Sequence, residues 1–482
     1  MTGCGFHERV VCGVALSALP VDKLRQYLRE LPSGARALLI AELERAVLRG
    51  DEIPGGDMLL QEVRAAVRES GERMPRLGNP ARLFFRPIEP FLIDAAADRK
   101  TPGRIPRAGL EPVWTWISRD LAPVECKAYC DEVNRAIAAG NMEPSASLAL
   151  SLHEVVAQRM HAALASAETD EKARRRMSTQ FAMPNAPDHI HDIATILSCR
   201  DALELIESRL PGHIRNLSEG TLDNVKSLLD SPICAEHKLR PYALIMVMNR
   251  LAVPWQLIRV AVKAAESDAA ARIAASPYAL AVTITLGDIE RMVGDLRSDL
   301  KRGAAVAVTS LLKCIHDAVR GVRTELDLSA DSPWGRQLSA IRSEISNVLK
   351  AEIESVPGRV RRLLRPRPSN EIARGSVLDA DEVADTEAMI EFVGACRNYA
   401  SELAISEMTL RTFQDIQQFL DTGTRSLLDG LRMAGEPDRP FRKSQVDAAI
   451  RFCGRAFGKD YASLLVKAAE MAGNAERRVA RA

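Results

Sequence analysis

Residues 289–322 read IERMVGDLRSDLKRGAAVAVTSLLKCIHDAVRGV, and this stretch decides the fold class. Its apolar residues recur every three or four positions on both sides of Gly303, which is the spacing of one buried face on each of two helices. A glycine commonly ends a helix, so Gly303 separates them. The stretch therefore predicts two helices that share one core. The expected core positions are Ile289, Met292, Val293, Leu296 and Leu300, then Val308, Leu311, Leu312, Ile315, Val319 and Val322.

Helical spacing of the same kind reaches both ends of the chain. Pro20, Ser33 and Asp57 each stand where a helix commonly begins, so they predict three short helices near the start. Their expected core positions are Leu24, Tyr27, Leu28 and Leu31, then Leu39, Leu43 and Val47, then Leu60, Val63 and Val67. Four further helices are predicted near the end, and they are long enough to close a small bundle. They cover 388–410, 413–431, 446–453 and 460–471.

Strands have almost no signal in this sequence. The one run of β-branched residues, 282–285, lies in an alanine-rich helical setting. No strand alternates with the helices, which argues against a Rossmann or other doubly wound fold. The sequence predicts an all-α fold, a multi-helix protein with two or three helical bundle-like regions and Pro-rich connectors. We find no fixed repeat of about 30 to 45 residues, so a solenoid has no support from the sequence.

Charged and proline-rich stretches divide the chain into three expected helical regions. These are an N-terminal region at 13–165, a central region at 186–356 and a C-terminal bundle at 380–482. The first boundary follows a charged stretch at 168–178, and the second is a linker at 357–374 that mixes prolines, glycines and arginines.

The N-terminal region contains a connector at 71–112. Its seven prolines cannot belong to one continuous helix. We expect Phe84, Phe85 and Phe91 to pack this connector onto a helical layer.

Composition limits the possible partners and locations. The chain has 482 residues with a net charge of +1, so no global field would gather nucleic acid or an anionic membrane. Its nine cysteines are odd in number and scattered, which is typical of a reduced, intracellular protein. The apolar stretch 10–19 lacks a signal-peptide cleavage site, and no apolar run reaches about 18 residues. We therefore expect a cytoplasmic protein without integral membrane association.

Common catalytic motifs are missing. The chain has neither GxxxxGK[ST] nor GxGxxG after a strand, which argues against nucleotide binding through those loops. It also lacks the GxSxG elbow of many hydrolases. His153 and Glu154 begin a zinc-protease-like motif, but Ala157 stands where the second histidine is needed.

The densest cluster of metal-binding residue types is Asp188-His189-Ile190-His191-Asp192. Adjacent His and Asp in an all-helical protein resemble the HD-domain phosphohydrolases, in which imidazoles and carboxylates bind a metal that activates water. Since His161 precedes His191 by 30 residues, His161, His191 and Asp192 form a candidate divalent-metal site.

A simpler interpretation, which we favour, makes the same cluster the start of a helix. Asp188 would then accept the first free amide hydrogens, and Asp192 would favour the positive end of the helix dipole. Ile193, Ile196 and Leu197 would face the core.

Two cysteines, Cys126 and Cys130, are four residues apart and share a helix face. One such pair makes neither a structural zinc site nor a Cys-x-x-Cys redox motif. We expect buried free thiols.

A basic segment could bind anions such as phosphates or a membrane surface. It consists of Arg359, Arg361, Arg362, Arg365 and Arg367. Residues 371–440 hold 14 acidic and 6 basic side chains, so the segment could instead complement its own neighbour. No aromatics that would stack on bases lie nearby, so nucleic acid is not the expected partner.

These observations favour a non-enzymatic role. Aromatic residues are only 4% of the chain, and polar residues converge in no single stretch. We expect a helical scaffold, adaptor or regulatory protein that acts by protein–protein interaction and needs no cofactor. The alternatives are an HD-like phosphohydrolase with a divalent metal, and a nucleic-acid-associated protein that uses the segment 359–367.

Overall fold

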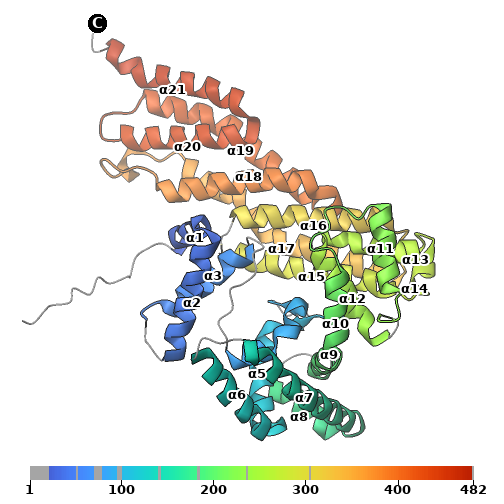
Figure 1. Cartoon of the computed structure of the whole chain (residues 1–482). Coiled ribbons are helices and arrows are strands. Elements are labelled where there is room, and N and C mark those ends of the chain that lie inside the picture. Colours follow the sequence, from blue (N-terminus) through green and yellow to red (C-terminus); the bar gives the residue numbers. More distant parts are fainter. Residues whose placement is uncertain are drawn as a thin grey trace, which may run out of the picture. The chain divides into compact units, whose positions relative to one another are not determined.

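The structure is a computed structural model of the chain (Figure 1). It describes residues 21–49, 53–69, 79–94, 100–138, 143–181, 185–234, 237–302 and 305–479. The apolar stretch 10–19, Gly303, and parts of the connector at 71–78 and 95–99 lie outside the described residues.

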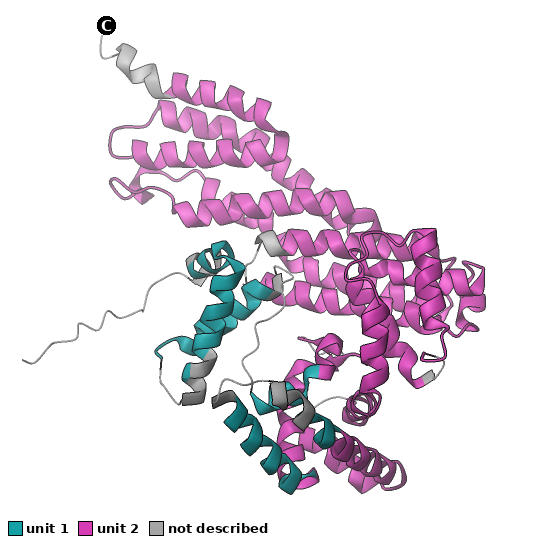
Figure 2. Cartoon of the chain, in the orientation of Figure 1, with its two compact units in different colours: residues 1–86, 122–153 teal, residues 87–121, 154–482 magenta. Residues whose placement is uncertain are grey.

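The chain forms two compact units (Figure 2). Unit 1 comprises Met1–Arg86 and Ala122–His153, and unit 2 comprises Pro87–Leu121 and Glu154–Ala482. Both units are therefore discontinuous in sequence, whereas the regions expected from the sequence were each continuous.

The all-α prediction is confirmed. Helices make up nearly all the regular structure of the described residues, and the one sheet there consists of two short parallel strands. The α-helices that lie in unit 1 or begin there are α1 (Val21–Glu30), α2 (Ser33–Arg49), α3 (Gly56–Glu69), α4 (Pro80–Phe84), α6 (Pro123–Ala138) and α7 (Glu143–Thr169). The other elements up to residue 274 are η1 (Arg86–Phe91), β1 (Leu92–Ile93), β2 (Ile105–Pro106), η2 (Arg107–Gly109), α5 (Leu110–Trp116), η3 (Ile117–Leu121), α8 (Glu171–Phe181), α9 (Ala186–Ser198), α10 (Arg200–Arg209), α11 (Glu219–Leu229), η4 (His237–Leu239), α12 (Arg240–Arg250), η5 (Pro254–Leu257), α13 (Ile258–Ala265) and α14 (Ala270–Ala274). Longer helices then dominate: α15 (Ala279–Arg302), α16 (Ala305–Glu325), α17 (Pro333–Leu364), α18 (Ala380–Leu403), α19 (Ser406–Arg432), α20 (Arg439–Phe457) and α21 (Lys459–Val479), with η6 (Ser369–Glu371) before α18.

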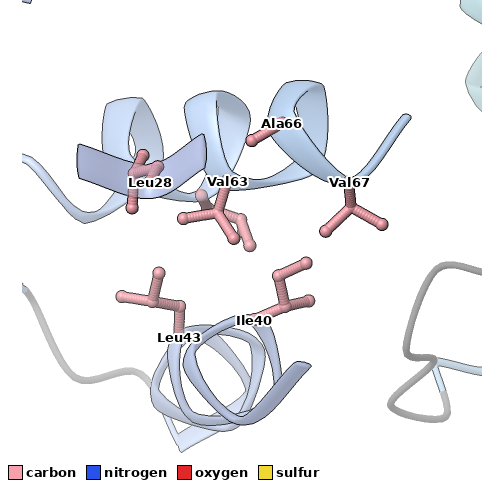
Figure 3. Close-up of a cluster of buried hydrophobic side chains, with 7 residues drawn as sticks. Leu28, Ile40, Leu43, Val63, Ala66 and Val67 are labelled. Atoms are coloured by element: carbon pink, nitrogen blue, oxygen red, sulfur yellow. The ribbon is translucent and has the colours of Figure 1, made fainter. Parts of the chain in front are cut away.

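A small apolar core joins the first three helices of unit 1 (Figure 3). The predicted core positions Leu28, Leu43 and Val63 are buried, but Tyr27 is 60% exposed and is a wrong prediction. The complete buried cluster is Leu28, Ile40, Leu43, Leu60, Val63, Ala66 and Val67.

Aromatic packing organises the rest of unit 1. Phe84 is fully buried, and its ring lies edge-on to that of His153 at 4.7 Å between centroids. His153 Nε2 also lies 2.7 Å from the Phe84 carbonyl oxygen. His153 therefore serves packing, in keeping with the incomplete zinc motif around it.

The seven long helices of unit 2, α15 to α21, form a two-layer array (yellow to red in Figure 1). In one layer α16 packs on α18 and α18 on α20, and in the other α15 packs on α17, α17 on α19 and α19 on α21. Helices of the two layers also pack across the array, as α19 does on α20 and α20 on α21. This architecture is that of stacked helical pairs, although the sequence shows no repeat.

The predicted core of α15 and α16 is confirmed at most positions, while Met292, Leu300 and Leu311 are half-buried. Ile289, Val293 and Leu296 of α15 are buried, and so are Ile315 and Val319 of α16. The run of β-branched residues at 282–285 also belongs to α15, as its alanine-rich setting indicated.

The expected linker at 357–374 begins too early, because α17 continues through Pro357 to Leu364. A proline inside a helix removes one hydrogen bond and costs about 3 kcal/mol. Each fully buried large aliphatic side chain contributes roughly 1.5–3 kcal/mol, so the apolar stripe of α17 outweighs that cost. This stripe consists of Leu338, Ile341, Ile345, Leu349, Ile353, Val356, Val360 and Leu363.

The four C-terminal helices are confirmed, but several predicted boundaries are wrong. Helices α18, α19 and α20 begin at Ala380, Ser406 and Arg439 rather than at 388, 413 and 446, and α21 reaches Val479 rather than 471. The first was predicted to run to residue 410, but α18 ends at Leu403 because Ala404 takes a left-handed conformation with φ of 58°. Alanine gives no sequence signal for that conformation, which glycine usually adopts.

Among the helices of the described residues, none is long and apolar enough to cross a membrane.

Ala404→Gly should stabilise the protein by about 1 kcal/mol, because glycine adopts a positive φ without the steric cost that alanine incurs. Ala384→Gly, at an exposed position inside the same helix, is the matched control and should lose about 1 kcal/mol. Urea unfolding of both variants measures the two changes. A loss of stability in Ala404→Gly would show that this helix end is not strained.

Candidate functional site

Helix α9 carries the cluster that the sequence singled out. Asp192 and His189 are buried, whereas Asp188 and His191 are exposed. Ile193, Ile196 and Leu197 face the core, as the helix-start interpretation expected.

The start of α9 differs from that interpretation in one respect. Its N-cap is Asn185 at φ 56°, without a side-chain capping bond, and Asp188 lies in the first turn. Asp188 therefore does not cap the helix, but its charge still suits the helix dipole.

On the buried side, Asp192 binds two partners. Lys100 donates from Nζ to Asp192 Oδ2, and the Tyr242 hydroxyl donates to Asp192 Oδ1 at 2.7 Å. Lys100 Nζ also donates to the Arg104 carbonyl at 2.6 Å. Burial lowers the pKa of Lys100, while the Asp192 charge opposes that shift. The cluster links the segment after residue 99 to α9 and α12.

The segment after residue 99 passes very close to α12 and α15. Only glycine fits at two of these contacts, at Gly103 in the segment and at Gly287 on α15. Gly103 has φ of 73°, and a Cβ there would lie 2.8 Å from Ile245 Cδ1 of α12. A Cβ on Gly287 of α15 would lie 2.3 Å from Thr101 Oγ1. Phe91 packs edge-on against Tyr242 at 5.3 Å between ring centroids, so this part of the connector does pack its aromatic side chain on a helix.

His189 lies beside this cluster and is kept neutral. Burial and then the positive charge of Lys100 lower its pKa to about 4. Its Nδ1 is buried without a hydrogen-bond partner.

A small cavity adjoins the cluster, and its volume of about 10 Å³ suits roughly one water molecule. Its two arginines differ in pairing. Arg291 binds Asp288 at 2.8 Å and Asp295 at 2.7 Å, while Arg104 makes contacts of 3.4 Å or more to Asn249. The cavity lining is Ile93, Thr101, Arg104, Gly287, Asp288 and Arg291.

On the exposed side of α9, the structure brings together two of the three candidate metal ligands. The rings of His161 and His191 lie 6.2 Å apart at an interplanar angle of 74°. Asp192 does not join them, because both of its carboxylate oxygens are bound by Lys100 and Tyr242. In the described part of the chain, no group of three or more His, Cys, Asp or Glu is arranged to hold a metal ion.

The cysteine pair of α6 is a pair of free thiols. Cys126 is buried and Cys130 half-buried. Burial raises the pKa of both, that of Cys126 to about 12, so neither is a thiolate at neutral pH.

Three arginines of the basic segment have partners within the chain. Arg362 pairs with Glu382 of α18, Arg361 lies over the ring of Phe419, and Arg367 lies over that of Phe441. Of the other two, Arg359 is half-buried in α17 and Arg365 is exposed at its end. Of the three, Arg362 meets an acidic side chain of 371–440, as the intramolecular alternative expects, whereas Arg361 and Arg367 contact aromatic rings.

Sequence reasoning missed Lys100 and Tyr242. They lie 92 and 50 residues from Asp192, and neither belongs to a motif. The one available signal was the cost of burying Asp192, which requires a cationic or hydrogen-bonding partner somewhere in the chain.

Comparison with known proteins gives no relative: no family model, no curated protein and no solved structure matches this chain.

His189 should make stability pH-dependent in acid. Its folded pKa of about 4 lies below the unfolded value of 6.5, so the unfolded state binds more protons between these pH values. The contribution of neutral His189 is present above pH 6.5 and is lost as the pH falls toward 4, by up to about 3 kcal/mol. His189→Gln should lose less stability than the wild type over this range in urea unfolding, whereas His213→Gln, at an exposed position, should follow the wild type. If the unfolding free energies of all three proteins changed with pH in parallel, the lowered pKa of His189 would be contradicted.

Proposed function

We propose that this chain is a non-enzymatic helical scaffold, adaptor or regulatory protein that binds another protein along α21, the last helix of the two-layer array. The observation that carries the proposal is the exposure of large apolar side chains on that helix. Leu464 is 63% exposed, Met471 75% and Val466 41%.

Leu464 and Met471 lie beside the face that α21 buries, whereas Val466 lies about 200° around the helix from Leu464. Tyr461, Leu465 and Ala472 form the inner stripe against the array, and all are half-buried or buried. Leu464 and Met471 are seven residues apart, so they lie two turns apart on one side of the helix. Their spacing is that of a stripe that packs against another helix.

The position of α21 in the array supports a helix as the occupant. Each inner helix of the array is covered by further helices, and α21 packs on α19 and α20. End helices of stacked arrays usually have a polar outer face, because that face meets water. An amphipathic helix of a partner protein, with apolar residues at positions i, i+3 or i+4 and i+7, fits the exposed stripe.

The proposal also includes a cytoplasmic location and the lack of a cofactor. A cytoplasmic location is supported by the free cysteines, among them Cys234, Cys396 and Cys453. The proposed activity requires no cofactor. The phosphohydrolase alternative is weaker, since its expected carboxylate ligand, Asp192, is bound by Lys100.

The test is a comparison of tagged full-length protein with the double variant Leu464→Asp/Met471→Asp, each recovered from its native cells. The wild type should retain a protein partner in stoichiometric amount. The amount of partner recovered with the double variant should be at least about tenfold lower, because two charges in the contact cost more than 1.4 kcal/mol of binding free energy. A crosslink between α21 and a helical segment of the partner should be found by mass spectrometry.

The matched control is Val377→Asp, because Val377 is 62% exposed and lies outside α21. It should keep the partner, and circular dichroism melting should show all the proteins equally folded. Recovery of the same partner with the double variant, or of the wild-type chain alone, would overturn the proposal.

A further inference from the structure

The exposed side of α9 offers a second feature, which is independent of α21. His161 of α7 and His191 of α9 come from different helices of unit 2, yet their rings lie 6.2 Å apart. Both side chains are exposed, so neither is held by a surrounding core. Exposed side chains change rotamer readily, and small movements can bring the two rings closer.

The separation is near that of two imidazoles on one metal ion. With metal–nitrogen bonds of about 2.1 Å, two rings bound to a tetrahedral metal have their centres roughly 5 Å apart. A decrease of about 1 Å therefore suffices, and it needs no movement of the helices. Imidazole is the ligand that zinc, nickel and copper ions favour among neutral side chains.

A serine lies beside the ring of His161. His161 Nε2 lies 3.4 Å from Ser198 Oγ, and that hydroxyl donates to the Ala194 carbonyl at 2.8 Å. The hydroxyl hydrogen is therefore used, so Ser198 is placed to accept from Nε2–H in the tautomer that has its lone pair on Nδ1. Metal-binding histidines commonly hold their second N–H in this way.

We propose that His161 and His191 form a two-imidazole site for a late first-row divalent metal ion, with zinc as the reference ion. Asp192 is not a ligand. Since no third His, Cys, Asp or Glu joins the pair in the described residues, water fills the remaining positions. The bound ion would link α7 to α9 and stabilise unit 2, because a ligand that binds the folded state shifts the unfolding equilibrium.

The experiment is calorimetric titration of the full-length chain with zinc chloride at pH 7.5, together with thermal melting at several zinc concentrations. The wild type should bind one ion at this site and melt at a higher temperature as zinc increases. His161→Gln and His191→Gln should each weaken that binding by at least about tenfold and remove the shift in melting temperature. Ser198→Ala should weaken binding less than either histidine variant.

His213→Gln is the matched control, because it removes an exposed imidazole elsewhere in unit 2 and should bind zinc as the wild type does. All these positions are exposed, so the variants should fold, and melting without metal checks this. Zinc binding that is absent in the wild type, or equal in the wild type and both histidine variants, would overturn the proposal. Neither result would bear on α21, whose test uses different residues and a different readout.

Discussion

Burial of one apolar stripe per helix, between neighbours on two sides, is the constraint on which the C-terminal half of unit 2 depends. Helix α17 illustrates it, because its stripe packs against α15, α18 and α19 and keeps it helical through Pro357. Ion pairs such as Arg323 with Glu402 lie at the edges of these contacts. Exposed pairs of this kind contribute little, so the apolar stripes supply most of the stability.

A different interaction fixes the proline-rich segment, which has no apolar stripe. Lys100 and Asp192 are both largely buried, and such a pair costs free energy unless further hydrogen bonds complete it. Tyr242 and the Arg104 carbonyl supply those bonds. The cluster therefore adds directional hydrogen bonds to the apolar packing of the segment, in which Ile88, Phe91 and Ile105 are fully buried.

The sequence predicted those parts of the fold that depend on local periodicity. The paired stripes around Gly303 indicated α15 and α16 because a helical stripe is a local pattern. The break at Ala404 was missed because alanine rarely takes a positive φ, so the sequence gives no signal for it. The two-layer array was missed because its helices differ in length and sequence, so stacking leaves no repeat.

The candidate site shows why adjacency in sequence is a poor guide on a helix. Consecutive residues of an α-helix point about 100° apart, so His191 and Asp192 meet different surroundings. Asp192 turns inward to Lys100, while His191 turns outward to His161. Adding Asp192 to that pair required one helix to present two neighbouring residues to the same point, which its geometry does not favour.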